Sequence, residues 1–192
     1  MKIAIIGKGN VGTALAEGLS RKHEIKFGHR DPKEPVNAAA KWGEIIILAV
    51  PYTAVPETAK AIGSAADGKT ILDCTNALTE EGGLALGFTT SAAEELQKKL
   101  PKAHVAKAFN TVFARNQSTG KIGKEQLTLF VASDDAKAKQ EVIQLGRDIG
   151  FDLVDAGPLK AARYLEPMGM LIISLGYNLS MGTNIGYKLV KC

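Results

Sequence analysis

A glycine-rich loop near the N-terminus constrains the fold of this chain more than any other feature. The loop is Gly7-Lys8-Gly9-Asn10-Val11-Gly12; it follows the apolar run Ile3–Ile6 and precedes an amphipathic segment that extends to about Lys22. A G-x-G-x-x-G sequence between a strand and a helix is typical of dinucleotide-binding domains. The first glycine makes a tight turn, the second lets the backbone approach a pyrophosphate, and the third lets helix and strand pack closely. We therefore expect a dinucleotide on the helix N-terminus, with a glycine-rich turn that binds nothing as the alternative.

The end of the second expected strand indicates which dinucleotide binds. NAD sites usually place Asp or Glu there to accept from the ribose 2′-OH. This chain has Gly28-His29-Arg30 and then Lys33, with no carboxylate before Arg30. The planar guanidinium of Arg30 suits a 2′-phosphate, whereas Asp31 before Pro32 is typical of a turn. The pattern favours NADP(H), with a solvated loop as the alternative.

Composition indicates one globular domain. The 192 residues are 45% hydrophobic and 23% charged, with a net charge of +4 and 6% aromatic residues. No block of basic residues supports nucleic-acid binding, and no apolar run is long enough to span a bilayer. Cys74 and Cys192 form neither a disulfide framework nor a metal-ligand pattern. We expect a cytoplasmic protein with free thiols, no metal, and no nucleic-acid or membrane partner.

Apolar runs of strand length alternate with helical patterns along the chain. Continuous apolar runs suit parallel strands that helices cover on both faces, and the alternation predicts a doubly wound sheet. Ser91-x-x-Glu94 is a capping box for a helix that ends before Pro101, and Ser133-Asp134-Asp135 begins another that extends to about Arg147. The expected strands are Lys2–Gly7, Glu24–Gly28, Glu44–Val50, Thr70–Cys74, His104–Phe109, Leu127–Ala132 and Phe151–Asp155.

The interval from Arg30 to Glu44 is too short for a crossover helix and a further strand. It contains one short helical pattern around Asn37–Trp42 and no strand pattern. We therefore expect an α/β fold: a Rossmann-type doubly wound, mostly parallel sheet that lacks the usual third strand and leaves the second at an edge. Residues 1–192 form one NADP-binding domain in this prediction, with residues 158–192 as a C-terminal helical segment.

Small and polar residues follow three expected strands, at the edge where open α/β sheets bind ligands. Tyr52 either stacks on a ring or packs in the protein. Asn76 and Asn110 either bond a carboxamide or hold turns. Hydride transfer needs no further catalytic group, because the reacting atoms belong to cofactors. The three strand ends are Ala49-Val50-Pro51-Tyr52, Cys74-Thr75-Asn76-Ala77 and Phe109-Asn110-Thr111.

Lys107 is unusual because a cation in an interior strand is costly unless it is paired. It is expected to pair with a carboxylate, to lie near a sheet edge or, as a third alternative, to act in catalysis. His104 begins the same strand and is expected to be structural.

Motifs along nearly the whole chain resemble the coenzyme F420-dependent NADP oxidoreductases and the related N-terminal reductase domain of the STEAP metalloreductases. The resemblance implies NADPH with its nicotinamide at the strand ends, facing a flavin or deazaflavin. It implies that Lys8 to Val11 hold the pyrophosphate, that His29 and Arg30 hold the 2′-phosphate, and that Val50, Asn76, Asn110, Thr111 and Ala114 approach the nicotinamide half. The motifs are the glycine loop, Gly28-His29-Arg30, Leu48–Pro51, Leu72–Asn76, Thr89–Glu94, Val105–Thr111, and Asp155–Leu159 with Ala162-Arg163.

Three functions are compatible with these features. The first is an NADPH-linked oxidoreductase that passes hydride to a soluble acceptor, either the deazaflavin coenzyme F420 or a flavin (FMN or FAD). The second, a small β-hydroxyacid or imine reductase, shares the glycine loop but needs a large helical domain, and little beyond one helical tail follows Pro158. The third is an NADP(H)-binding redox sensor without catalysis.

The C-terminal segment predicts an interface. Met168–Leu175 is apolar almost all round, which is more than one helix face buries against a single sheet. We expect a symmetric homodimer in which this helix packs against its mate and closes the acceptor pocket. A helix buried in its own subunit is the alternative.

Overall fold

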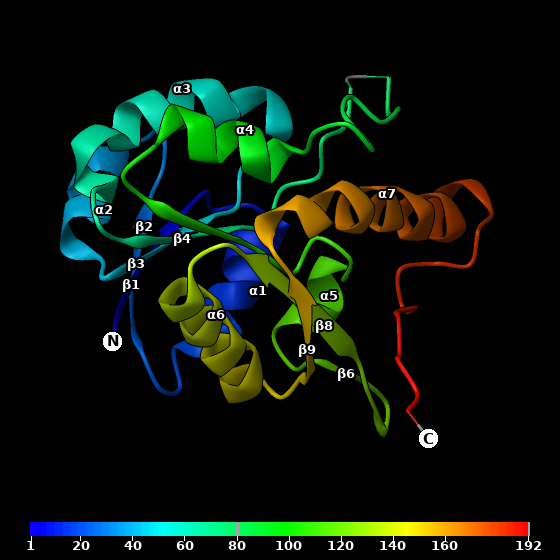
Figure 1. Ribbon diagram of the computed structural model, residues 1–192. Coiled ribbons are helices and arrows are strands. Elements are labelled where there is room, and N and C mark those ends of the chain that lie inside the picture. Colours follow the sequence, from blue (N-terminus) through cyan, green and yellow to red (C-terminus); the bar gives the residue numbers. More distant parts are fainter. Residues whose placement is uncertain (80, 192) are drawn as a thin grey trace.

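The computed structural model describes residues 1–79 and 81–191, which form a seven-stranded sheet with helices on both faces (Figure 1). Cys192, one of the two expected free thiols, lies outside the described residues. No helix in the described part of the chain is long and apolar enough to cross a membrane. The strands are β1 (Lys2–Ile6), β2 (Glu24–Gly28), β3 (Ile45–Leu48), β4 (Thr70–Asp73), β5 (His104–Lys107), β8 (Thr128–Ser133) and β9 (Asp152–Gly157).

The strand order is β2-β1-β3-β4-β5-β8-β9. The first five strands are parallel, β8 pairs antiparallel with β5, and β9 is parallel to β8. Among the described residues no strand lies beyond β2, so the absence of the usual third strand is confirmed. The reversal at β8 and the small hairpin of β6 (Lys121–Ile122) and β7 (Glu125–Gln126) were not predicted.

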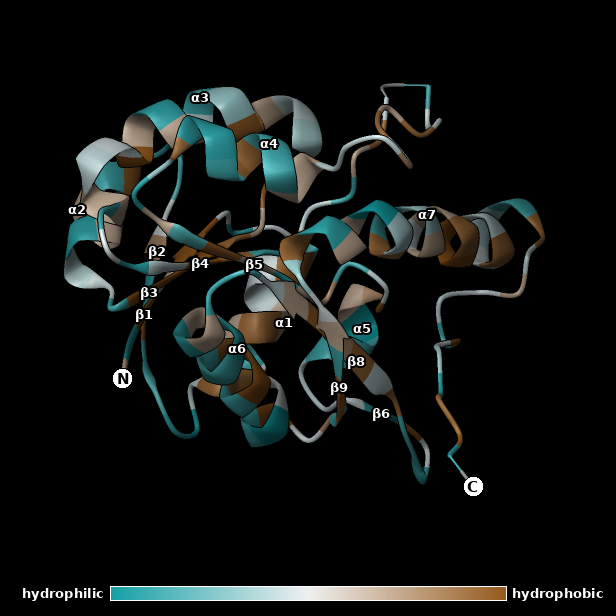
Figure 2. Ribbon diagram, in the orientation of Figure 1, coloured by the Kyte–Doolittle hydropathy of each residue, from teal (hydrophilic) through white to brown (hydrophobic). Residues whose placement is uncertain are grey.

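Side chains of successive residues in β1 belong to two separate cores. Ile3 and Ile5 face the core under α1 and α6, whereas Ala4 and Ile6 face the core under α2, α3 and α4. Figure 2 shows hydrophobic strands between helices that are partly hydrophilic, such as α3, α4 and α6. Burial on both faces explains the continuous apolar runs of the sequence. The helices are α1 (Asn10–Leu19), α2 (Val36–Trp42), α3 (Val55–Ile62), α4 (Ala92–Lys99), α5 (Ala114–Gln117), α6 (Ala136–Ile149) and α7 (Ala162–Ile173).

Both predicted helix caps are present. Ser91 Oγ accepts from the N–H of Glu94 at 3.2 Å, and its hydroxyl donates to the Glu94 carboxylate at 2.7 Å. Asp135 Oδ1 accepts from the N–H of Ala138 at 2.7 Å. These bonds satisfy N–H groups that a helix start leaves unpaired.

The C-terminal helical segment is shorter than predicted. α7 continues as a wider π-helical turn, Ser174–Asn178, and residues 179–191 are not helical. Positive φ angles at Ser180 and Gly182 turn the chain away from the helix. The tail then runs beside the start of β8, where the N–H of Thr128 donates to the carbonyl of Tyr187 at 2.9 Å. The prediction for residues 179–191 was therefore wrong, because tertiary contacts with β8 replace helical hydrogen bonds.

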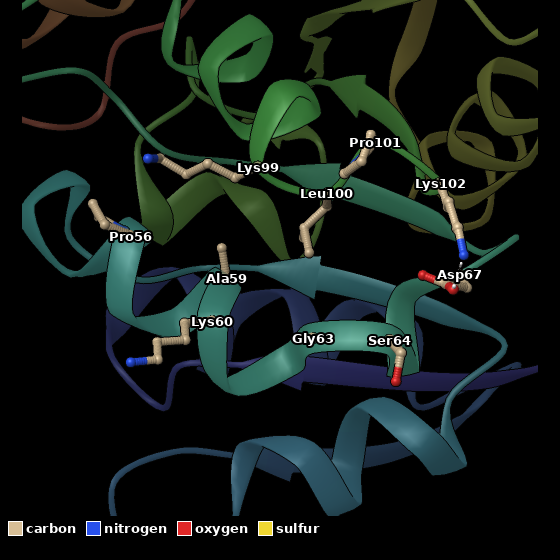
Figure 3. Close-up of a pocket in the computed structure, with 10 residues that line it drawn as sticks. All are labelled: Pro56, Ala59, Lys60, Gly63, Ser64, Asp67, Lys99, Leu100, Pro101 and Lys102. Carbon is tan, nitrogen blue, oxygen red and sulfur yellow. Dashed lines mark ion pairs between the residues drawn. The ribbon is translucent and has the colours of Figure 1, made fainter.

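A cavity of about 560 Å³ lies between α3, with the turn that follows it, and the C-terminal end of α4 (Figure 3). Lys60, Lys99 and Lys102 contribute to its lining, and Lys102 pairs with Asp67 at 3.4 Å. None of its lining residues follows the carboxyl end of a strand, so this cavity lies outside the edge where α/β sheets bind ligands.

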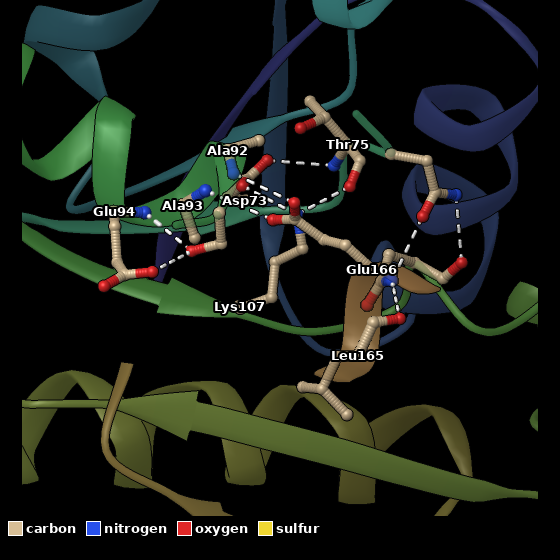
Figure 4. A network of polar contacts seen from close by, with 11 residues as sticks. Asp73, Thr75, Ala92, Ala93, Glu94, Lys107, Leu165 and Glu166 are labelled. Carbon is tan, nitrogen blue, oxygen red and sulfur yellow. Dashed lines mark hydrogen bonds and ion pairs between the residues drawn. The ribbon is translucent and has the colours of Figure 1, made fainter. Parts of the chain in front are cut away.

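Lys107 is fully buried between two carboxylates (Figure 4). Its Nζ lies 2.9 Å from Asp73 Oδ2 and 2.9 Å from Glu166 Oε1, and it donates to the carbonyl of Thr75 at 2.6 Å. Burial alone would lower the pKa of Lys107, but the two carboxylates reverse this effect and raise it. The expectation that Lys107 pairs with a carboxylate is confirmed. His104 pairs with Asp135 at 3.2 Å, which fits a structural role.

We expect Lys107→Met to lower the free energy of unfolding by about 3–5 kcal/mol, since it leaves two buried carboxylates without their cation. Urea denaturation followed by circular dichroism measures the change. Lys98→Met is the control, because Lys98 is exposed and pairs with Glu95 on the surface; it should cost no more than about 1 kcal/mol. Equal losses in the two variants would show that the buried pair contributes little.

Candidate functional site

The three glycines of the N-terminal loop meet different surroundings. Gly7 has a φ of +112°, and a Cβ at this position would collide with the carbonyl of Ala49. A Cβ at Gly12 would collide with the carbonyl of Gly7. A Cβ at Gly9 would meet no atom within 4 Å. The packing of the protein therefore requires glycine at positions 7 and 12, whereas Gly9 borders open space that a ligand can occupy.

Two cavities meet at the carboxyl ends of β1 and β3. The first, of about 550 Å³, extends from Gly7 and Lys8 to His29 and Arg30, and we call it the ribose-side cavity. The second, of about 490 Å³, extends from the glycine loop over the ends of β3 and β4, and we call it the strand-end cavity. Val50 and Pro51 line both. The strand-end cavity is lined by Gly9, Asn10, Val11, Ala49–Thr53, Cys74–Asn76, Leu78 and Thr79.

The residues predicted to bind the 2′-phosphate follow β2. Arg30 is exposed and lines the ribose-side cavity beside the partly buried His29. Lys33 lines none of the cavities described here; its N–H donates to Asp31 Oδ1 at 2.9 Å. That bond confirms Asp31 as a turn residue. The structure therefore brings His29 and Arg30 together and leaves Lys33 on the turn.

Glu34 is a site residue that sequence reasoning missed. Its carboxylate lies 2.5 Å from His29 Nε2 and 3.0 Å from Lys8 Nζ. Hydrogen bonds from Lys8 and then His29 lower the pKa of Glu34. The prediction of NADP(H) rested on the absence of a carboxylate before Arg30, but the turn at Asp31-Pro32 reverses the chain and returns Glu34 to His29. The turn sequence Asp31-Pro32 was the feature from which the position of Glu34 beside His29 could have been predicted.

Tyr52 begins a short 3-10 turn, Tyr52–Ala54, and is partly buried. It lines the strand-end cavity and also packs against the core under α2 and α3. Burial, with the nearby charges of Glu166 and Glu95, raises the pKa of its hydroxyl. Tyr52 therefore packs in the protein, as one interpretation expected, and it also borders the strand-end cavity.

Asn76 and Asn110 hold each other and α7. Asn76 Nδ2 donates to the carbonyl of Asn110 at 3.0 Å, while Asn110 Nδ2 donates to Asn76 Oδ1 at 3.1 Å and to the carbonyl of Leu165 at 2.7 Å. Gly169 of α7 lies so close that a Cβ would collide with Asn76 Oδ1. The side-chain amides of both residues thus bond within the protein. Of the two, only Asn76 lines the strand-end cavity.

Thr111 and Ala114 lie outside the strand-end cavity. Thr111 is buried. Ala114 begins α5 and lines a separate cavity of about 490 Å³, on the side of α1 that faces α5. Lys8, Gly9 and Asn10 line that cavity too, so the glycine loop borders three cavities.

Cys74 lines the strand-end cavity, but its thiol is not activated. Burial, reinforced by the charge of Asp73, raises the pKa of Cys74 well above its usual value. In residues 1–79 and 81–191, no group of three or more His, Cys, Asp or Glu side chains is placed to hold a metal ion.

Known proteins resemble the chain at the level of sequence. The family model described as NADP oxidoreductase, coenzyme F420-dependent, matches residues 2–43. The F420-dependent NADP reductase of Methanocaldococcus jannaschii is 28% identical and aligns with 98% of this chain and 94% of its own. Metalloreductase STEAP3 of Rattus norvegicus is 28% identical over 90% of this chain, which spans only 37% of that protein.

Solved structures agree with these relatives. A putative F420-dependent NADP-reductase from Arthrobacter sp. FB24 superposes over the full length of both chains with a TM-score of 0.92 and 28% identity. An imine reductase from Streptomyces aurantiacus has a TM-score of 0.67 at 16% identity and covers 94% of this chain and 64% of its own, which supports the fold alone. The comparisons confirm the resemblance and the Rossmann-like fold predicted from the sequence, and they support an enzyme of the NADP-dependent oxidoreductase class.

Proposed function

We propose that this protein transfers hydride between NADPH and a soluble deazaflavin or flavin acceptor. The observation that carries the proposal is the pair of cavities that meet at Val50 and Pro51, one reaching His29 and Arg30 and the other the ends of β3 and β4. A dinucleotide laid across the glycine loop has its two halves in these two cavities.

The chain's own residues supply binding and orientation. The N-terminus of α1 begins at Gly9 with no side-chain cap and no acidic residue in its first turn, so its N–H groups suit a pyrophosphate. Arg30 and His29 offer donors to a 2′-phosphate. Val50, Pro51 and Tyr52 offer a largely apolar surface to the nicotinamide. Bound in this way, NADPH supplies the hydride from its nicotinamide ring.

Coenzyme F420 is the acceptor we favour over FMN and FAD. The support is the name of the reductase from Methanocaldococcus jannaschii, which aligns over nearly the whole of both chains. The buried free thiol of Cys74 fits a reducing compartment, and we place the reaction in the cytoplasm.

Stopped-flow measurement of NADPH oxidation with F420, FMN and FAD tests the reaction. We expect F420 to give the fastest single turnover. Gly9→Val is the inactive control, because its side chain enters the open space beside Gly9 while the helix α1 stays folded. Tight NADPH binding without oxidation by any of the three acceptors would favour the redox sensor instead.

Arg30→Ala tests the assignment of NADP. We expect NADPH to bind roughly ten- to a hundredfold more weakly, since a charge-assisted bond contributes about 1.5–3 kcal/mol, and NADH to be little affected. Fluorescence titration gives both dissociation constants. Arg21→Ala is the control, because Arg21 is an exposed arginine at the far end of α1 from the glycine loop. An equal loss for the two cofactors would contradict a 2′-phosphate at Arg30.

We further propose a homodimer built on α7. Tyr164, Leu171 and Tyr177 are large, and each exposes more than half of its surface along this helix and its final turn. Large apolar side chains exposed along one element suit a protein–protein interface. Packed against its mate, α7 closes the strand-end cavity from outside.

Multi-angle light scattering over a dilution series tests the dimer. We expect the wild type to be dimeric at micromolar concentration and Leu171→Lys to be monomeric, since a lysine ammonium is costly to bury at an apolar interface. Val190→Lys is the control, because Val190 is even more exposed than Leu171 (77% against 52%) but lies in the C-terminal tail. A fully active wild-type monomer would reject the interface.

A further inference from the structure

Glu34 joins two hydrogen-bond donors, Lys8 and His29, at the border of the ribose-side cavity. Its carboxylate contacts His29 Nε2 at 2.5 Å and Lys8 Nζ at 3.0 Å. All three side chains are partly exposed. A ligand can therefore reach these contacts, unlike those of a buried ion pair. The proposed function gives His29 and Lys8 to the phosphates of NADPH. Glu34 therefore holds the donors that the cofactor needs.

Only the side chain of Glu34 has to move to release these donors. Its carbonyl accepts from the N–H of His29 at 2.8 Å, and its own N–H donates to the carbonyl of Asp31 at 2.9 Å. These backbone bonds fix the turn at residues 31–34. Rotation about side-chain bonds of a partly exposed glutamate has a low barrier and is fast, so the carboxylate can leave while the loop stays in place.

His29 and Lys8 each keep a second contact that does not involve Glu34. The N–H of Asp31 donates to His29 Nδ1 at 3.2 Å, which leaves the proton on Nε2, the nitrogen that faces Glu34. Lys8 Nζ lies 5.3 Å from the centre of the Phe27 ring, within range of a cation–π interaction. These contacts therefore keep His29 and Lys8 in place when the Glu34 carboxylate leaves.

We infer that Glu34 is an internal competitor of the cofactor's 2′-phosphate and that it sets how strongly the site prefers NADPH over NADH. This inference rests on the proposed function. In the free protein the carboxylate takes the place of the anion between His29 and Lys8. When NADPH binds, the 2′-phosphate accepts from His29 and displaces the like-charged carboxylate, which also frees Lys8 for the pyrophosphate. NADH carries a 2′-hydroxyl, which does not repel Glu34 and can donate to it.

Isothermal titration of Glu34→Gln measures the competition. Glutamine keeps the size of the side chain and removes its charge. We expect NADPH and adenosine 2′,5′-bisphosphate to bind at least about fivefold more tightly than to the wild type, as expected when one like charge at roughly 4 Å in water is removed. NADH and adenosine 5′-diphosphate should change less than about twofold.

Two further variants control the experiment. Glu57→Gln removes a carboxylate from α3 that lines the cavity beside His29 and Arg30, yet no hydrogen bond joins Glu57 to Lys8 or His29 in the described part of the chain. This variant should match the wild type. Glu34→Ala should gain affinity for the same two ligands as Glu34→Gln. Thermal melting verifies that each variant is folded.

The possible outcomes separate this inference from the proposed function. Wild-type titration with NADPH alone judges the cofactor site, and absence of binding there, with none in Glu34→Gln, would reject the proposed function. If the wild type binds NADPH but Glu34→Gln binds it equally or more weakly, Glu34 is not a competitor. An equal gain for NADPH and NADH would likewise overturn the inference, because it would show a general charge effect in place of selection at the 2′ position.

Discussion

The ion pair of Lys107 with Asp73 and Glu166 connects the sheet to α7, the helix that packs on the carboxyl ends of β4 and β5. Asp73 ends β4, Lys107 ends β5 and Glu166 comes from α7, so one buried cation joins three elements distant in sequence. Asp73 Oδ1 also accepts from the N–H of Thr75, whose carbonyl accepts from Lys107. Both backbone groups of Thr75, its N–H and its carbonyl, are therefore hydrogen-bonded to this ion pair. The strand-end cavity depends on this, because Thr75 is part of its lining.

The same interaction determines where α7 lies. Leu165 and Gly169 of this helix contact Asn110 and Asn76, so the ion pair and the two amides hold adjacent turns of α7 against the ends of β4 and β5. A helix held in this way limits how far the cavity extends beyond the strand ends. Phe109, with a φ of 66°, adopts a conformation that is costly for a bulky residue. It turns the chain after β5, and the buried bonds of its neighbour Asn110 compensate for that strain.

The sequence predicted those parts of the structure that local patterns determine. The strands, both helix caps and the roles of Gly7 and Gly12 follow from hydrophobic periodicity and from backbone geometry within a few residues. Apart from the local β6–β7 hairpin, the missed features depend on distant contacts: the reversal of β8, the tail beside it, and the bonds of Asn110 to α7. Glu34 lies between these cases. It is only five residues from His29, but its role depends on a turn whose direction the sequence pattern left unspecified.

The helix N-termini differ in what satisfies their free N–H groups. At α4, Ser91 caps the N–H of Glu94, and the Glu166 carboxylate accepts from the N–H groups of Ala92 and Ala93 at 2.9 and 3.3 Å. These bonds also balance the second negative charge that accompanies Lys107, because a helix N-terminus carries a partial positive charge. At α6, Asp135 serves as the cap. At α1 the cap position is Gly9, which has no side chain to offer, and the first turn has no acidic residue. Side chains cap the N-termini of α4 and α6, whereas α1, like α2, α3, α5 and α7, has no side-chain cap. At α1, Gly9, Asn10 and Val11 line the strand-end cavity, which is where we propose that the phosphates bind. Glu34 contacts Lys8 and His29 and not this helix N-terminus.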